Sequence, residues 1–429
     1  MRTAFRPCPV CGSKKFREVY RRVHVVFDGH PLAGEYQAGS CVRCGSVFDR
    51  HGAAPEDFVT YYANFSKYYS KGMLLDPYYE AIADAVASIV PDREARIVDL
   101  GAGGGEMLAA LQRRGYRGLA GLEPSPDCAA HIRDVLGIPC WNGSITSLEG
   151  LSGKWDVLLS TGVFEHLLEP FRAVGEFSRL VAPGGHVFVL VPDLERYVEC
   201  LSTPFQEFSV EHINHFTATS LGGLFARHGW ATTQMGKITR TVTPTCSYPD
   251  LWCAFSPSEE VQEPEASDEV GFRCIQEYVA ASERLLARIR CHLERALPPG
   301  RFVMWGAGQT ASLLLSGGLL RNRELVTVID GNAAYNGRRL CGAPIVSHRA
   351  DSAKALANID IPILVASLRE ATAIEATIRG LGYLNPVVLP LPRTDSEIPT
   401  NTAGAETGFC DSYLKDHCIE DNINGFDVR

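Results

Sequence analysis

The sequence lacks two features that would place the chain in a membrane or direct it out of the cell. It contains no run of about 18 apolar residues, which excludes a long apolar membrane-spanning helix. Its first thirty residues are charged and polar, unlike the basic start and apolar stretch of an export signal. We therefore expect a cytoplasmic protein with no membrane partner.

Basic residues are in the minority, with 41 lysines and arginines against 50 aspartates and glutamates, a formal net charge of −9. A field of that sign disfavours a polyanionic partner, so we expect no nucleic-acid binding by the whole chain. Five basic residues gather near the amino terminus, where a solvated hairpin face explains them better than a nucleic-acid contact: Lys14, Lys15, Arg17, Arg21 and Arg22. The composition leaves the oligomeric state open.

Fourteen cysteines are spread over 429 residues without an export signal, so a disulfide framework is not expected. Four of them form two C-x2-C pairs, Cys8 with Cys11 and Cys41 with Cys44, each followed by glycine. Four thiolates suit tetrahedral zinc and leave no open position for catalysis. We predict a structural zinc site, with reduced and metal-free thiols as the alternative. The alternating stretch REVYRRVHVVF between the pairs predicts a strand.

Short apolar runs alternate with helical patterns in two parts of the chain. In the first part they are RIVDLG, GLAGLEP, WDVLLST and GHVFVLVP; in the second they are RFVMWG, LVTVID, IPILVAS and PVVLPL. Such alternation is typical of a parallel, doubly wound sheet with helices on both faces. The fold class is therefore α/β, with two separate sheets.

Changes in composition and breaks in the apolar patterns predict further helix and domain boundaries. A helix is expected from Pro77 to Val90, and a long amphipathic helix from Val270 to about Ala296. The predicted parts are a zinc-binding module with an aromatic segment (1–75), a first α/β domain (76–250), an acidic linker with the long helix (251–299), a smaller Rossmann-like α/β domain (300–391) and a mobile tail (392–429).

A glycine-rich turn, VDLGAGGGEML, follows the first predicted strand of the 76–250 domain. Asp99 ends the strand, and three glycines lead into the next helix: Gly101, Gly103 and Gly105. Glycine lets the backbone pass close to a ligand, and a helix start offers free N–H groups. Glu106 stands where a dinucleotide-binding turn has its third glycine. Glu123 ends the next strand, where a carboxylate can accept both hydroxyls of a ribose.

Together with WDVLLSTGVFEHL and LVAPGGHVFVLVP, this turn resembles the cofactor site of class I methyltransferases over roughly residues 96–230. The resemblance implies a methyltransferase that uses S-adenosylmethionine, in preference to an NAD-binding protein. The implied cofactor contacts are Asp99, Gly101, Gly103, Gly105 and Glu123, then Asn142, Ser144 and Ile145 near the adenine, and Ser160, Thr161 and Gly162 near the amino-acid part.

The order of the parts resembles that of sugar C-methyltransferases, which methylate carbon 3 of a nucleotide-linked 4-keto-deoxysugar. The catalytic base of that family lies in a Glu-His pair matched by Glu211 and His212, in SVEHINHF. The match implies that His212 is the base and Glu211 its orienting or substrate-binding neighbour. His166, in FEHL, is matched to a histidine that contacts the ketone or a hydroxyl. Tyr68 and Tyr69 fall in a region from which the family supplies a substrate-binding tyrosine.

This chemistry needs a base because carbon beside a ketone becomes nucleophilic only after its C–H is removed. An imidazole, whose pKa lies near 7, suits that proton transfer. His215 is expected to pack in the interior. A metal held by His212 and His215 is disfavoured because no further ligand cluster lies near them in the sequence.

One departure from the family leaves the reaction open. Ser209 stands three residues before the predicted base, where the family has tyrosine. Two alternatives therefore remain beside C-methylation. One is methylation of oxygen or nitrogen on another small molecule, and the other is a recognition protein without catalysis.

The second α/β domain has its own glycine turn, WGAGQTASLLL, with Gly306, Gly308 and Ala311. Asp330 follows about twenty residues later, which completes the spacing of an NAD-type fingerprint. By spacing alone a redox activity is possible. The family resemblance instead implies a domain that anchors the nucleotide of the substrate, and a purely structural role stays open.

Overall fold

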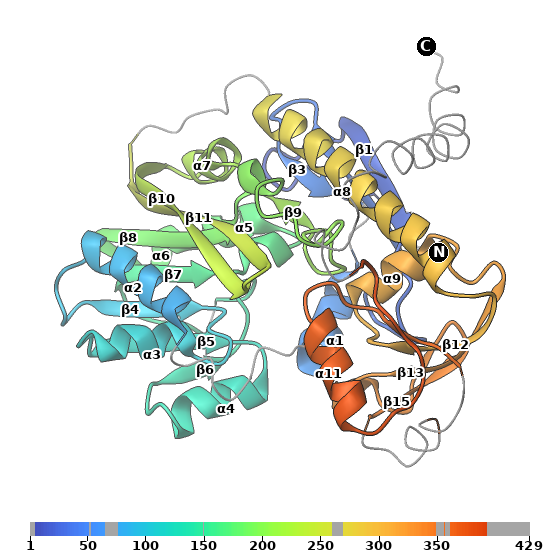
Figure 1. The fold of residues 1–429 in the computed structure, drawn as a ribbon. Coiled ribbons are helices and arrows are strands. Elements are labelled where there is room, and N and C mark those ends of the chain that lie inside the picture. Colours follow the sequence, from blue (N-terminus) through green and yellow to red (C-terminus); the bar gives the residue numbers. More distant parts are fainter. Residues whose placement is uncertain are drawn as a thin grey trace, which may run out of the picture. The chain divides into compact units, whose positions relative to one another are not determined.

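The computed structural model describes residues 5–50, 53–64, 76–148, 150–259, 269–348, 356 and 361–392. The chain forms two compact units (Figure 1). Unit 1 comprises residues 1–24, 29–201 and 205–279, and unit 2 comprises residues 25–28, 202–204 and 280–429. The tail predicted to be mobile lies, from residue 393 on, outside the described residues. Among the described helices, none combines the length and apolar character needed to cross a bilayer.

Unit 1 contains a four-stranded antiparallel sheet in the order β1-β2-β3-β9. Its strands are β1 (Phe16–Val23), β2 (Glu35–Cys41), β3 (Val47–Asp49) and β9 (Asn214–His215). The predicted strand between the cysteine pairs is confirmed, although it ends at Val23. The fourth strand comes from the SVEHINHF stretch, more than 160 residues away in the sequence.

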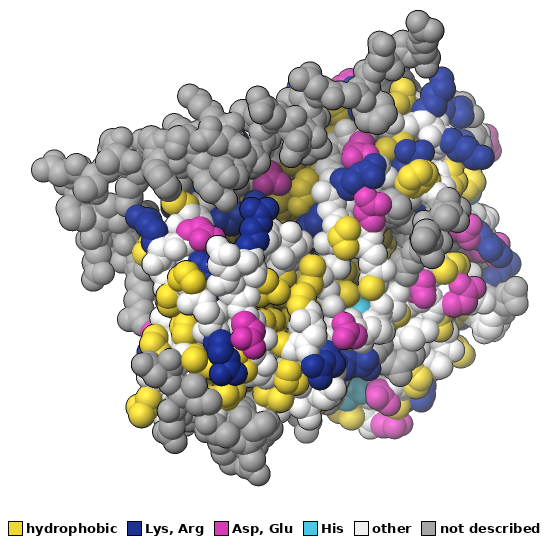
Figure 2. Space-filling model, turned by 90° about the vertical axis from the view of Figure 1, so that its right-hand side faces the viewer, with side chains coloured by type: hydrophobic (Ala, Val, Ile, Leu, Met, Phe, Trp, Pro, Cys, Tyr) yellow, Lys and Arg dark blue, Asp and Glu magenta, His cyan; other side chains and the backbone are white. Residues whose placement is uncertain are grey.

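Two basic residues of β1 have acidic partners within unit 1, whereas Arg22 is buried and donates to the carbonyl of Phe208 at 3.3 Å. Arg17 pairs with Glu269 at 3.1 Å, and Arg21 pairs with Glu18 at 2.8 Å and with Glu35 at 3.1 Å. These contacts support the interpretation of the cluster as a solvated hairpin face. On the face of the molecule shown in Figure 2, basic and acidic side chains lie intermixed.

Unit 1 also contains a seven-stranded sheet in the order β10-β11-β8-β7-β4-β5-β6. Its strands are β4 (Arg96–Leu100), β5 (Gly118–Glu123), β6 (Cys140–Asn142), β7 (Trp155–Thr161), β8 (Val181–Pro192), β10 (Trp230–Thr243) and β11 (Cys246–Pro257). The strands β4 to β8 are parallel, and β11 pairs antiparallel with β8 and β10. The four strands predicted from apolar runs are confirmed.

Helices cover both faces of this sheet because its central strands are apolar and buried on both sides. Ile97, Val157 and Phe188 pack with helices α2 (Pro77–Ile89), α3 (Glu106–Arg113) and α4 (Pro126–Asp134). Side chains on the other face of the sheet, such as that of Val98, pack with α5 (Pro170–Gly175), α6 (Phe177–Leu180) and α7 (Ala218–Ala226). This second core also contains Cys8, Cys41, Cys44 and Phe48, so the cysteine module packs on the same face. Helix α1 (Pro55–Asn64) belongs to unit 1 as well.

Strand β11 continues to Pro257, past the boundary predicted between residues 250 and 251, because Leu251, Cys253 and Phe255 are buried in the sheet core. Helix α8 (Glu269–Ala296) confirms the predicted long helix. The finer division into five parts remains a prediction, since the structure separates two units.

Unit 2 contains a six-stranded sheet in the order β14-β15-β13-β12-β16-β17. Its strands are β12 (Gly300–Trp305), β13 (Arg323–Ile329), β14 (Arg339–Leu340), β15 (Ala343–Val346), β16 (Ile363–Val365) and β17 (Val387–Val388), with helices α9 (Gln309–Ser316) and α11 (Ala371–Gly380). All pairings are parallel except that of β14 with β15. The predicted second α/β fold is confirmed.

Candidate active site

The four predicted metal ligands lie together in unit 1. The Sγ atoms of Cys8 and Cys44 are 3.6 Å apart, those of Cys11 and Cys41 are 3.5 Å apart, and all four lie within 4.8 Å of one another. Zinc–sulfur bonds of about 2.3 Å in a tetrahedron require sulfur separations of about 3.8 Å. The cluster could therefore hold a zinc ion with four sulfur ligands and no open position.

The cysteine module holds the SVEHINHF stretch in place. Strand β3 pairs with β9, so that Val47 lies opposite His215, and the N–H of Asp49 donates to the carbonyl of Ile213 at 2.9 Å. The guanidinium of Arg6 donates to the carbonyl of Asp49 at 2.7 Å, to the carbonyl of Ile213 and to Oδ1 of Asn214 at 2.7 Å. The module therefore positions the backbone directly after His212.

His215 is buried between two phenols. The hydroxyl of Tyr36 lies 2.7 Å from its Nε2, and the hydroxyl of Tyr197 lies 3.1 Å from its Nδ1. Burial, followed by repulsion from Arg6, lowers the pKa of His215 to about 3. The ring is therefore neutral, and the predicted interior packing is confirmed.

His212 and His166 lie in contact at the end of β7. Their ring centroids are 4.9 Å apart, and Nδ1 of His212 lies 3.8 Å from Oε2 of Glu207. Nε2 of His166 lies 3.7 Å from Oε1 of Glu165. The side chain of His212 is 22% exposed, so the ring is not sealed from solvent, whereas that of Glu207 is 1% exposed.

Burial changes the protonation of this cluster. Burial first, and then repulsion from His166, His215 and Arg240, lowers the pKa of His212 well below 6.5. Burial raises the pKa of Glu207 to about 8, and it also raises the pKa of Glu165. At neutral pH the imidazole of His212 is therefore unprotonated, the state that a general base requires.

The same cluster offers metal ligands that lie far apart in the sequence. Ligand atoms of Glu165, His166 and His212 lie within 4.8 Å of one another. The sequence analysis disfavoured a metal held by His212 and His215, and it did not predict this other group, whose members lie far apart in the sequence. His215 does not belong to this group, since both of its ring nitrogens face tyrosine hydroxyls.

Two residues beside the histidines were not predicted. Glu207 is the carboxylate that faces Nδ1 of His212, and the ring of Tyr62, on α1, lies 6.2 Å edge-on from that of His166. The predicted neighbour Glu211 instead accepts a hydrogen bond from Nδ1 of His166 at its backbone carbonyl, at 2.9 Å. The predicted substrate contacts Tyr68 and Tyr69 lie outside the described residues.

The glycine turn of unit 1 has the backbone that only glycine adopts easily. Gly101, Gly103 and Gly105 all have positive φ, and at Gly101 φ is +95°. A Cβ at Gly101 would also lie only 2.6 Å from Val163. The turn therefore packs directly against the segment that follows β7.

That contact joins the glycine turn to the histidines. Gly162 follows β7, and a Cβ built there would lie 3.5 Å from Oε1 of Glu165. His166 comes next, in the short 3-10 helix η2 (Phe164–His166). The turn and the histidine pair therefore share the edge formed by the carboxyl ends of β4, β5 and β7, where ligands bind in open α/β sheets.

Three carboxylates surround the turn. Glu123 accepts hydrogen bonds from the N–H groups of Gly103 and Ser125, both at 2.8 Å. Asp99 is 1% exposed, and neither of its carboxylate oxygens has a hydrogen-bond partner among the described residues. Burial, and then the charges of its neighbours, raises the pKa of Asp99 to about 8, and burial raises that of Glu123 to about 7. Burial also raises the pKa of Glu106. The arrangement suits a cationic ligand, which would favour the ionised acids.

The other predicted cofactor residues lie at the same edge and differ in what their side chains do. Asn142 donates to the carbonyl of Glu123 at 3.0 Å, and the hydroxyl of Ser144 lies 2.9 Å from that of Thr146. Ile145 is buried in the core. Ser160 is also buried and donates to the carbonyl of Leu100 at 3.2 Å, which links β7 to β4. Thr161 ends β7, directly before Gly162.

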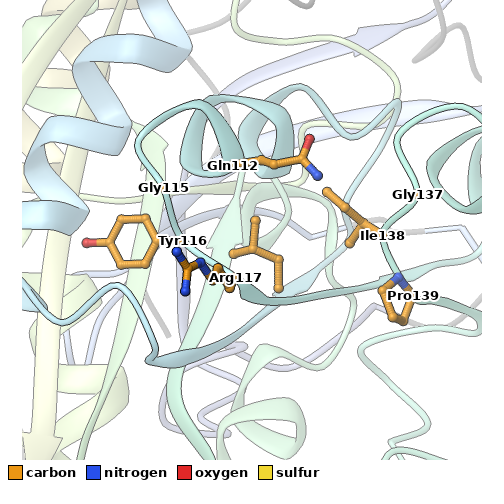
Figure 3. Close-up of a pocket in the computed structure, with 8 residues that line it drawn as sticks. Gln112, Gly115, Tyr116, Arg117, Gly137, Ile138 and Pro139 are labelled. Carbon is orange, nitrogen blue, oxygen red and sulfur yellow. The ribbon is translucent and has the colours of Figure 1, made fainter.

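A separate surface pocket lies at the opposite edge of this sheet (Figure 3). Its lining residues precede β5 and β6, and they include Gly115, Tyr116, Arg117, Ile138 and Pro139. The glycine turn and the histidines follow the carboxyl ends of strands instead. The pocket is therefore not the candidate active site.

The second glycine turn, in unit 2, begins with a similar glycine, although Gly308 is extended where Gly103 of unit 1 has a positive φ. Gly306 has a φ of +105°, and Asp330 accepts hydrogen bonds from the N–H groups of Ala307 at 2.8 Å and Asn332 at 2.7 Å. The predicted strand, turn, helix and acid are thus all present.

Comparison with known proteins gives matches to part of the chain. A family model described as a methyltransferase domain matches residues 76–235. Uncharacterized methyltransferases of Mycobacterium sp. strains KMS and MCS are each 34% identical over 119 residues, which is 25% of this chain and 47% of those proteins. The chain thus spans about half the length of these curated relatives.

Solved structures were matched as well. A chain from the complex of the Haloferax volcanii Trm112 methyltransferase activator with a methyltransferase is 20% identical. That match covers 47% of this chain and 98% of that one, with a TM-score of 0.39. An S-adenosylmethionine-dependent methyltransferase from Mesorhizobium loti is 16% identical, and its match covers 40% of this chain and 95% of that one, with a TM-score of 0.33.

Proposed function

We propose that this chain, whose residues 76–235 form a class I methyltransferase domain, transfers a methyl group from S-adenosylmethionine to a carbon atom beside a ketone. The proposed acceptor is a nucleotide-linked 4-keto-deoxysugar, methylated at carbon 3. The observation that supports this most directly is the neutral, partly exposed His212, in contact with His166 at the strand edge that also forms the glycine turn.

The residues of the turn fit the proposed cofactor. Asp99, Glu106 and Glu123 offer buried carboxylates to a molecule that contains a sulfonium and an ammonium group, and Glu123 is the proposed acceptor for the ribose hydroxyls. When bound there, S-adenosylmethionine supplies an electrophilic methyl group. The buried carboxylate oxygens of Asp99 have no hydrogen-bond partner among the described residues, so a cationic ligand would stabilise them most.

His212 is the proposed base for removal of the proton beside the ketone. With Nδ1 directed at Glu207, Nε2 is the nitrogen available to the substrate. As the imidazole gains a proton, its positive charge favours ionisation of Glu207, which then stabilises the imidazolium. A positioned base of this kind contributes about 10²- to 10⁴-fold to a rate.

His166 and Tyr62 are proposed to contact substrate oxygens. Since Nδ1 of His166 donates to the Glu211 carbonyl, Nε2 is the nitrogen left to contact a substrate oxygen. Burial raises the pKa of Tyr62 well above 10, so its phenol stays protonated and can donate to a developing enolate.

We assign the four cysteines to a structural zinc ion that stabilises the module beside SVEHINHF. Loss of that ion would loosen β3 and its pairing with β9. The zinc would then act on catalysis only through the position of His212.

Hydrogen exchange tests the proposed base. The protein is incubated in heavy water with S-adenosylhomocysteine and a 4-keto sugar nucleotide, and deuterium at the carbon beside the ketone is measured by mass spectrometry. His212→Asn should abolish exchange and leave S-adenosylhomocysteine affinity unchanged, while the control His228→Asn should behave as the wild type. Normal exchange by His212→Asn would show that the base is another residue.

Methylation of oxygen or nitrogen is the alternative, and Ser209 favours it. The Ser209 hydroxyl accepts the backbone N–H of His212 at 3.2 Å and so closes a turn, whereas the sugar C-methyltransferases have a phenol at this position. The atom that receives a labelled methyl group, identified by NMR of the product, distinguishes the two reactions.

A further inference from the structure

Arg240 lies at the same strand edge as the histidines, although no sequence motif marks it. Strand β10 pairs antiparallel with β11, and β11 pairs antiparallel with β8, so β10 runs in the direction of the parallel strands. Arg240 lies near its carboxyl end. The charge of Arg240 acts on His212, Glu165 and Glu207, which places the guanidinium close to the histidine pair.

Two aromatic rings hold this guanidinium. Its Cζ atom lies 5.3 Å from the ring centroid of Tyr78, on α2, and 5.3 Å from that of Tyr248, the residue opposite it in β11. Its Nε is shielded from solvent. Among the residues that the structure describes, Arg240 has neither a hydrogen bond nor an ion pair.

Asp250 is the acid whose charge acts on Arg240, and the described residues show no ion pair between them. Asp250 is buried and accepts a hydrogen bond from the hydroxyl of Tyr78 at 2.9 Å. Burial raises the pKa of Asp250 to about 7 against the opposing effect of Arg240. Asp250 therefore does not supply a full compensating charge at neutral pH.

An unpaired, half-buried cation is costly unless something compensates for it. Stacking on two aromatic rings returns only about 0.5–2 kcal/mol. A guanidinium that lies against aromatic rings can still bind two oxygens of one acidic group through its N–H groups.

We propose that Arg240, held between Tyr78 and Tyr248, is the binding site for an oxyanion group of the methyl acceptor. That group is a phosphate or a carboxylate, so the acceptor is an anionic molecule. The inference rests on the proposed function only in assigning this anion to the acceptor.

The test is binding of small anions, which needs no turnover. Inorganic pyrophosphate and malonate are titrated separately into the full-length protein saturated with S-adenosylhomocysteine, with isothermal titration calorimetry as the readout. Arg240→Gln should lower the affinity for whichever anion binds by about 10- to 100-fold, which corresponds to the loss of one or two charge-assisted hydrogen bonds. Arg240→Lys should recover part of that loss. The matched control Arg117→Gln removes a surface arginine paired with Glu94 and should leave binding unchanged.

A second variant should raise the affinity for the anion instead of lowering it. Asp250→Asn removes the carboxylate beside Arg240 but keeps an oxygen that can accept from Tyr78, so anion binding at pH 8 should strengthen several-fold. Preference for pyrophosphate would identify a phosphorylated acceptor, and preference for malonate a carboxylic acid.

Several outcomes would overturn the proposal. The first is that neither anion binds, and the second is that Arg117→Gln loses as much anion affinity as Arg240→Gln. The third is that Arg240→Gln loses S-adenosylhomocysteine affinity while its anion affinity stays intact, which would assign the arginine to the cofactor carboxylate. Anion binding by a protein that transfers no methyl group would instead contradict the proposed reaction alone.

Discussion

The two glycine turns of this chain begin with a similar positive φ and then differ in backbone and in charge. In unit 1, Gly101 has φ +95° and Glu123 accepts from the N–H of Gly103 at 2.8 Å. In unit 2, Gly306 has φ +105° and Asp330 accepts from the N–H of Ala307 at 2.8 Å. In both, the acid also accepts from the N–H two residues after it.

The side chains around the turns separate them. Counting from the first glycine, Asp99 of unit 1 corresponds to Met304 of unit 2, and Glu106 corresponds to Ala311. Met304 and Ala311 are fully buried and apolar. Unit 1 thus has three buried acids around its turn, and two of these positions are apolar in unit 2. The additional acids therefore distinguish the first turn, and they suit the cationic cofactor that we propose.

The largest effect on stability is expected when the turn of unit 2 receives an acid at the position that corresponds to Asp99 of unit 1. Met304→Asp places a carboxyl where nothing in the described part of unit 2 provides a partner, and it should destabilise the protein by about 3 kcal/mol or more. Met304→Leu keeps the volume and should cost less than about 1.5 kcal/mol. Chemical denaturation measures both. Equal stability of the two variants would show that the second turn tolerates charge and would remove the distinction.

Damage to the antiparallel sheet of unit 1 is expected to lower the rate of methyl transfer but not the affinity of the glycine turn for the cofactor. Cys41→Ser should release the metal, loosen β3 and displace His212, and a displacement of about 1 Å costs roughly 100-fold in rate. S-adenosylhomocysteine affinity should stay near that of the wild type. Rates are measured with the methyl-transfer assay and zinc by mass spectrometry. One zinc per chain would fit the cysteine site, whereas two would show that Glu165, His166 and His212 also hold a metal.

The two acids allow a matched pair of variants. Glu123→Gln should weaken S-adenosylmethionine binding by about 10- to 100-fold, because a charged acceptor is lost beside the turn and the ribose. Asp330→Asn makes the same change in unit 2 and should leave that affinity unchanged. Calorimetric titration of both proteins provides the comparison. Equal losses would mean that the cofactor is not confined to the first turn.

The acids of the first turn also predict a pH dependence. The pKa of Glu123 is raised to about 7 and that of Asp99 to about 8, so the two acids lose their protons between about pH 6 and 9. Since a cation binds the ionised forms, affinity for S-adenosylmethionine should rise with pH, by about tenfold for Glu123 alone, and level off above about pH 9. Binding at pH 7 should release protons, measured by calorimetry in buffers of different ionisation enthalpy. Glu123→Gln should flatten the profile.

The same comparison shows what sequence could predict. Strands such as β4 and β12 have strong apolar patterns, and both turns have recognisable spacing, so both sheets and the acids at positions 123 and 330 could be located. Glu207, Tyr62 and Arg240 could not, because each reaches the site through tertiary packing from a segment without a motif. The two-residue strand β9 has no periodicity of its own, and its pairing with β3 spans more than 160 residues.

The smallest effect is expected at the link between neighbouring strands. In unit 1 the carbonyl of Leu100 accepts the hydroxyl of Ser160 at 3.2 Å, and in unit 2 the corresponding carbonyl of Trp305 accepts the backbone N–H of Ala366 at 2.8 Å. Ser160→Ala therefore removes a bond that unit 2 makes without a side chain, and it should cost about 1 kcal/mol of stability. Cofactor affinity should change by less than about threefold, because the hydroxyl faces the protein. A larger loss of affinity with unchanged stability would place Ser160 on the cofactor.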